Sequence, residues 1–126
     1  SDNDCGSWER RAAAYRETKD YFETLVQMVR EGRLSPSRKH GKELSQLVEC
    51  VLYVCSQQDP FSETRPSESL PLDVADFVGS VLRVLEVDWN LDVGHRHYER
   101  AIAACCNVGD WKVASRLFEK QIDPNA

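Results

Sequence analysis

Apolar side chains recur at the period of an α-helix along most of this chain of 126 residues. The clearest run has apolar residues at positions i, i+3, i+4, i+7, i+8 and i+11: Val74, Phe77, Val78, Val81, Leu82 and Leu85. This spacing places the apolar side chains on one face of a helix, where other elements must cover them. No segment shows the sustained alternation of apolar and polar residues that is typical of a half-buried strand. The sequence therefore predicts an all-α fold.

Start and stop signals divide the chain into helices predicted at residues 8–31, 36–56, 72–87, 93–107 and 110–122. Ser7 and Asp92 are the expected N-caps of the first and fourth helices. Ser35 and Pro36 suit the start of the second helix. The basic residues that follow oppose the helix dipole, which makes Gly41 the alternative start. We expect about five helices arranged in antiparallel hairpins.

Residues 57–71 form the longest segment without a helical pattern, and they contain three prolines and three serines. We interpret this segment as a loop within one domain, because 126 residues are enough for a single core. Gly79 lies in the middle of the third predicted helix, where it costs about 1 kcal/mol relative to alanine. We expect it to permit the close approach of a neighbouring helix.

The chain carries 21 acidic and 16 basic residues, which gives a formal net charge of −5. This balance disfavours nucleic acid as a partner, because such binding depends on neutralising phosphates. Basic residues nevertheless cluster between positions 30 and 42, and acidic residues predominate between positions 59 and 92. The two clusters are either solvated faces or a bipolar surface that orients a charged partner.

The five cysteines do not indicate a disulfide framework, because their number is odd and no pair has the Cys-x-x-Cys spacing. Cys50, Cys55 and Cys105 lie in apolar helical runs, and we interpret them as small buried side chains. This cysteine usage predicts an intracellular, reducing compartment. No stretch of the sequence is apolar enough to predict a membrane span.

Catalytic motifs are missing from the sequence, including Gly-rich phosphate loops, Gly-x-Ser-x-Gly and His-Glu-x-x-His. His95, His97, Cys105 and Cys106 are side chains of the types that bind zinc. His95 and Cys105, however, are separated by roughly 15 Å along one predicted helix. We therefore expect a non-enzymatic protein without a metal ion or cofactor.

The last two predicted helices carry a hairpin signature. Its elements are an aromatic and apolar face, a turn glycine, a small residue and an apolar helix end: Tyr98, Ala101, Ile102, Gly109, Ala114, Leu117 and Phe118. Residues 97–124 thereby resemble one pentatricopeptide repeat, and tetratricopeptide repeats follow similar logic. The resemblance implies an antiparallel helix pair that closes into a bundle or forms one piece of a longer solenoid. A solenoid fragment would leave an apolar end surface around Trp111, Leu117 and Ile122.

The resemblance also implies single-stranded RNA as a possible partner, within a factor of RNA metabolism. The basic cluster would then contact phosphates, together with Arg96 and Arg100. Glu99 stands where that family has its base-reading residue, and a carboxylate at this position repels phosphate. The acidic net charge likewise ranks a protein partner above RNA.

Three functions follow from these observations. The first is an adaptor or scaffold that binds a partner protein through a groove between helices or through an exposed end. The second is RNA binding, and the third is self-association into a homodimer through the apolar stripe from Trp8 to Val29. The candidate contact residues for a partner are Arg30, Arg33, Arg38, Lys39, Lys42, Arg96, Glu99, Arg100 and Trp111.

Overall fold

The structure is a computed structural model that describes residues 2–58 and 73–123, with side chains from residue 9 onward. Within these ranges it contains helices and no strand, which confirms the all-α prediction. The helices are α1 (Asp2–Arg30), α2 (Gly41–Ser56), α3 (Val74–Arg83), α4 (His95–Asn107) and α5 (Trp111–Ile122), and α3 continues into a π-helical turn, η1 (Val84–Asp88). Most of the predicted loop at 57–71 lies outside the described residues.

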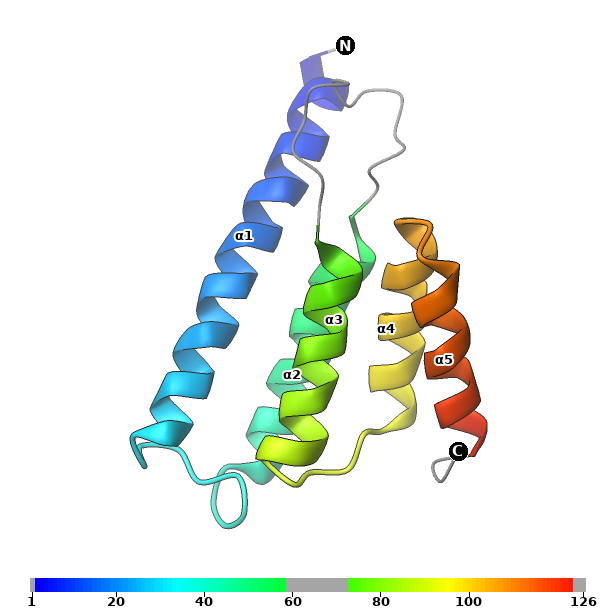
Figure 1. Cartoon of the computed structure of the whole chain (residues 1–126). Coiled ribbons are helices and arrows are strands. Elements are labelled where there is room, and N and C mark those ends of the chain that lie inside the picture. The colour runs from blue at the N-terminus through cyan, green and yellow to red at the C-terminus, as the bar shows by residue number, and fades with distance from the viewer. Residues whose placement is uncertain (1, 59–72, 124–126) are drawn as a thin grey trace.

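Successive helices run in opposite directions, as Figure 1 shows. α1 and α5 lie on opposite sides of the molecule, with α2, α3 and α4 between them. α4 packs against α2, α3 and α5, so it occupies the centre of the contact network. None of the described helices combines the length and the apolar character that a bilayer-spanning segment requires.

The first two helices begin at other positions than the cap signals predict. α1 already starts at Asp2, so Ser7 lies inside the helix and does not cap it. α2 starts at Gly41, so the predicted start at 36 is wrong and the alternative start is confirmed. The preceding residues form a closed turn in which the Ser35 amide donates to His40 Nδ1 at 2.9 Å. The late start keeps two basic residues out of the first turn, where they would oppose the helix dipole.

The cap of α4 also differs from the prediction. Gly94, and not Asp92, occupies the N-cap position. The Gly94 amide donates to Nδ1 of buried His97 at 2.8 Å, and Nε2 lies 2.9 Å from the Ser45 carbonyl of α2. Because Nδ1 accepts a hydrogen bond, Nε2 carries the proton and donates to Ser45. His97 thereby caps α4 and ties it to α2.

The hairpin of α4 and α5 is closed as the sequence predicts. Gly109 has a φ of 78°, which is the left-handed conformation that glycine adopts without strain. Asp110 is the N-cap of α5, and its carboxylate accepts from the Val113 amide at 3.1 Å. Ala114 is buried in this hairpin. These contacts fix how α5 lies on α4.

The core is built around the apolar stripe of α3. All six residues of the predicted stripe are buried. Tyr15 and Phe22 of α1 meet Phe77 edge to face, with ring centroids 5.9 and 5.8 Å apart. Trp89, which follows η1, packs against Phe22 with centroids 5.9 Å apart. Each such aromatic pair adds about 0.5–1.5 kcal/mol beyond the burial of its surface.

Candidate functional site

The five basic candidates between positions 30 and 42 lie at one end of the molecule. Arg30 ends α1, Lys42 stands in the first turn of α2, and Arg33, Arg38 and Lys39 lie in the connection between them. All five are exposed. Arg33 approaches Glu31 at 3.6 Å, and the other four form no ion pair with a described residue. This end of the molecule is therefore a solvated basic surface.

Of the three charged candidates on α4, two are exposed to solvent and one contacts another helix. Arg96 is exposed, and exposed Glu99 lies 3.8 Å from His95 one turn before it. Arg100, by contrast, donates to the Glu49 carbonyl of α2 at 2.7 Å. Its guanidinium also lies over the ring of Tyr53, 5.3 Å from the centroid. Arg100 therefore links α4 to α2 and is not a free surface cation for RNA.

Large apolar side chains are exposed along the outer side of α5. Trp111 is 65% exposed, Phe118 53% and Ile122 70%. Trp111 and Phe118 border a hollow of about 380 Å³ whose other wall includes Ile102 and Cys106 of α4. We call these five residues the end face. They belong to the hairpin of α4 and α5, which Figure 1 shows on the side of the molecule remote from α1.

The structure changes the membership of the predicted apolar end surface. Trp111 and Ile122 are exposed there as expected, but Leu117 is buried in the core. Phe118 takes its place on the surface, although the sequence pattern treats Leu117 and Phe118 together as the end of the repeat helix. On an amphipathic helix adjacent residues point in different directions, and only the position of α4 decides which of the two is covered.

The remaining residues of the repeat signature lie where a helix pair requires them. Ala101 and Ala114 are buried between helices, while Tyr98 and Ile102 are half-buried. This arrangement is the geometry of one closely packed hairpin. Any closely packed helix pair has this geometry, so it does not identify a repeat family.

The apolar stripe proposed for a homodimer is covered within the chain. Tyr15, Phe22 and Leu25 are buried, and Val26 and Val29 pack partly against the same core. The side chain of Trp8 lies outside the described side chains. The described part of the stripe is thus a core face of α1.

A hollow of about 490 Å³ lies between α1 and α3. Its lining includes an ion pair, with Lys19 Nζ 2.6 Å from the Asp73 carboxylate. Glu23, Arg30 and Asp76 add charges of both signs. The hollow therefore offers no single charge preference to a ligand.

The two fully buried cysteines are held in their neutral forms. Burial raises the pKa of the Cys55 thiol to about 12, with Cys105 as a further cause. Burial also raises the pKa of the Cys105 thiol to about 12, assisted by Asp110. A neutral buried thiol is a poor nucleophile, so neither cysteine is arranged for catalysis. Cys50 is exposed, and the prediction that it is buried is wrong.

Metal-ligating side chains are dispersed through the described residues. No group of three or more histidine, cysteine, aspartate or glutamate side chains in that part of the chain could hold a metal ion. His95 and Gln121 instead share a hydrogen bond of 2.8 Å between α4 and α5. The outstanding features of the molecule are therefore its surfaces, above all the end face.

Comparisons with known proteins leave the function to be argued from these surfaces. No protein-family model, no curated protein and no solved structure matches the chain.

Proposed function

We propose that this chain is a non-enzymatic interaction module that binds a helix of a partner protein through the end face. The observation that carries the proposal is the exposure of Trp111, Phe118 and Ile122 on one side of α5. Contiguous exposed apolar surface on a small protein marks an interaction site, whereas scattered single residues do not. Tryptophan and other aromatic residues also dominate the binding energy of many interfaces.

A helix is the partner element that fits this surface best. Trp111, Phe118 and Ile122 are separated by seven and then four residues, so they follow one line along α5. Ile102 and Cys106, one turn apart on α4, form the second line. Two lines of side chains with a hollow between them accept the apolar stripe of an amphipathic helix.

The packing of the helices supports the use of this face for stacking. α4 packs against α2, and the two helices run in the same direction in Figure 1. In helical-repeat proteins each hairpin buries one face against the next hairpin in this way. The end face is the outer side of the last described hairpin, where a further helix would continue that stacking. An adaptor or scaffold is the kind of protein that would use such a face.

The proposal is tested by removing the two aromatic side chains of the end face. Trp111→Ala combined with Phe118→Ala should leave the fold intact, because both side chains are more than half exposed. Tyr21→Ala is the matched control, since Tyr21 is an exposed aromatic residue on α1. Partner proteins are recovered from an extract with the wild-type chain, identified, and then titrated with each purified variant.

We expect the double variant to weaken binding by about 2 kcal/mol or more, as is usual for aromatic hot spots, and Tyr21→Ala to have little effect. Equal affinity of the wild type and the double variant would refute the proposal. Sedimentation of the chain alone shows whether a second copy occupies the end face instead.

RNA binding is the second candidate function, and the exposed basic residues between 30 and 42 favour it. Titration with single-stranded RNA of mixed sequence at low salt tests it directly. Affinity that falls steeply with added salt, and that is lost when Arg38, Lys39 and Lys42 are changed to glutamate, would support RNA over a protein partner.

A further inference from the structure

Another hollow lies beside α5, on a different side of this helix from the end face. It is a groove of about 340 Å³ between α3 with η1 and the hairpin of α4 and α5, and we call it the α3–α5 groove. Its apolar lining includes Leu82, Tyr98, Val113 and Leu117. Leu82 and Leu117 are buried core residues, so this wall of the groove is part of the hydrophobic core. None of these residues belongs to the end face.

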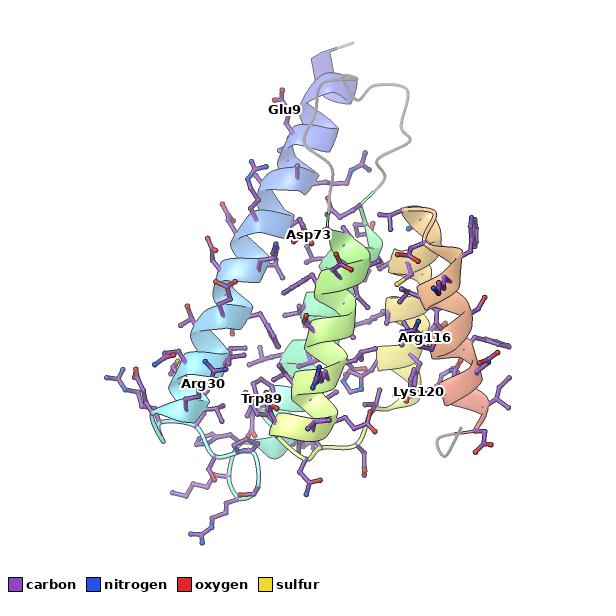
Figure 2. All side chains as sticks on the ribbon, viewed as in Figure 1. Glu9, Arg30, Asp73, Trp89, Arg116 and Lys120 are labelled. Atoms are coloured by element: carbon purple, nitrogen blue, oxygen red, sulfur yellow. The ribbon has the colours of Figure 1, made fainter. Side chains whose placement is uncertain are left out.

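Three cations border the α3–α5 groove against one acid. Arg83 comes from the end of α3, Arg116 and Lys120 come from α5, and Glu86 of η1 is the acid. Figure 2 shows Arg116 and Lys120 one turn apart on α5. None of the three cations forms an ion pair or side-chain hydrogen bond with a described residue. The groove therefore concentrates uncompensated positive charge in a chain whose net charge is −5.

The α3–α5 groove is lined by a glycine that the packing of the described helices does not require. Gly79 lines the groove from the middle of α3. A Cβ atom placed there would have nothing within 4 Å, so no neighbouring helix lies close enough to require glycine at this position. Glycine in an exposed helix interior costs about 1 kcal/mol relative to alanine. The prediction that Gly79 permits close helix packing is thus wrong, and the residue instead lies at the groove beside open space.

The lining also excludes part of the range of possible ligands. A polyphosphate chain or a nucleic acid would pair with the cations, but it would also meet Glu86 and would leave the apolar floor without an apolar partner. An apolar side chain flanked by carboxylates matches both the floor and the cations. Tyr98 adds a hydroxyl group, whose pKa is raised by burial and by Glu86, so that it remains a hydrogen-bond donor.

We propose that the α3–α5 groove binds an acidic amphipathic segment of a partner protein, with its apolar side chains on the floor and its carboxylates facing Arg83, Arg116 and Lys120. This site is separate from the end face, and a chain that binds one partner helix there can hold a second segment in the groove. The inference therefore goes beyond the proposed function and does not depend on it.

A synthetic peptide provides the probe. Its sequence carries leucines one helical turn apart with glutamates on both sides, and a matched peptide replaces every glutamate with glutamine. Fluorescence anisotropy with the full chain measures both affinities at low and moderate salt. We expect the acidic peptide to bind at least about tenfold more tightly than the glutamine peptide, and this advantage to shrink with salt. No binding of the acidic peptide, or equal binding of both peptides, overturns the proposal.

Paired variants locate the binding. Arg116→Glu with Lys120→Glu should weaken the acidic peptide at least about tenfold. Arg38→Glu with Lys39→Glu changes the net charge equally but lies outside the groove, and it should change the affinity less than about twofold. Equal losses in the two charge variants would mean that only the overall charge matters and would overturn the proposal.

A third variant fills the groove without changing any charge. Gly79→Leu projects a side chain into open space, so the helix should remain folded or become more stable while the peptide loses its site. Unchanged affinity in Gly79→Leu, with an intact thermal transition, overturns the proposal.

Trp111→Ala, a change in the end face, should leave peptide binding unchanged. A loss there as large as in the groove variants would place the peptide on the end face and also overturn it.

Discussion

At the scale of single residues, Asp73 joins the first helix to the third. Its carboxylate accepts hydrogen bonds from Tyr15 and from Lys19, each at 2.6 Å, and Figure 2 labels Asp73 at the start of α3. The hydrogen bond from Lys19 and then that from Tyr15 lower the pKa of Asp73. Burial, followed by the bond to Asp73, raises the pKa of Tyr15, so the phenol stays a donor. The hydrogen bond between Tyr15 and Asp73 joins residues that are 58 positions apart in the chain.

The lowered pKa of Asp73 predicts that the fold becomes less stable in acid. Its pKa is lower in the folded chain than the ordinary value of about 3.9 in the unfolded chain. Ionised Asp73 therefore stabilises the fold above about pH 4, and this contribution disappears as the pH falls through the folded pKa. Asp73→Asn keeps an oxygen that accepts from Tyr15 but removes the charge. Its stability deficit in urea unfolding should be present at neutral pH and shrink below about pH 4.

The control for this experiment is Asp92→Asn, because Asp92 is exposed and forms no ion pair with a described residue. It should show little deficit at any pH. The same deficit for Asp73→Asn at pH 7 and in strong acid would contradict a role for the charge of Asp73.

At the scale of helices, two glycines have opposite roles. A Cβ atom at Gly41, the first residue of α2, would lie 2.5 Å from the Pro36 carbonyl oxygen and 3.3 Å from Leu91. A Cβ atom at Gly79, in the middle of α3, would meet nothing within 4 Å. Close approach therefore requires glycine at the start of α2 and not inside α3. The sequence places both glycines in helical runs and does not distinguish them.

Alanine substitutions measure this contrast. Gly79→Ala should raise the free energy of unfolding by about 0.5–1 kcal/mol, because alanine is the better helix former and meets no obstacle. Gly41→Ala should lower it, because the backbone carbonyl of Pro36 cannot move aside without disturbing the turn before α2. Thermal unfolding followed by circular dichroism compares the two. Destabilisation by Gly79→Ala would show that the glycine has a role within α3 that its surroundings do not reveal.

At the scale of the whole molecule, the cysteines report how the helices cover one another. Cys55 of α2 and Cys105 of α4 are fully buried, whereas Cys50 of α2 is exposed. The buried thiols become reactive only when the helix packing opens, and their pKa of about 12 keeps them protonated in the folded chain at neutral pH. Site-resolved alkylation at pH 7.5 should label Cys50 rapidly and should label Cys55 and Cys105 slowly and together.

Urea provides the reference for this labelling. Unfolding should make all three thiols react at similar rates, because the burial that separates them is lost. Native labelling of Cys55 as fast as that of Cys50 would contradict the packing of α2 against α4.

Local patterns in the sequence determined the helices. The apolar period of residues 74–85 predicts α3 and its buried face, and the signals at Gly109 and Asp110 predict the turn between α4 and α5. These features depend on interactions within a few residues, so the sequence contains them directly. The start of α1 was missed, and the observed start of α2 at Gly41 was only the alternative, because cap signals compete with the helix dipole and with nearby turns.

Only the tertiary structure decided which faces remain uncovered. Periodicity indicates that Leu117 and Phe118 flank one apolar side of α5, but the position of α4 buries the first and exposes the second. The tertiary structure likewise decides that Arg100 is bound to α2, because its guanidinium donates to a carbonyl of that helix. Arg116 and Lys120 border the groove because α3 lies opposite them. A residue's own helix fixes its direction, whereas partners remote in the sequence fix its burial. The end face and the α3–α5 groove, and with them both proposed binding sites, arise from that second step.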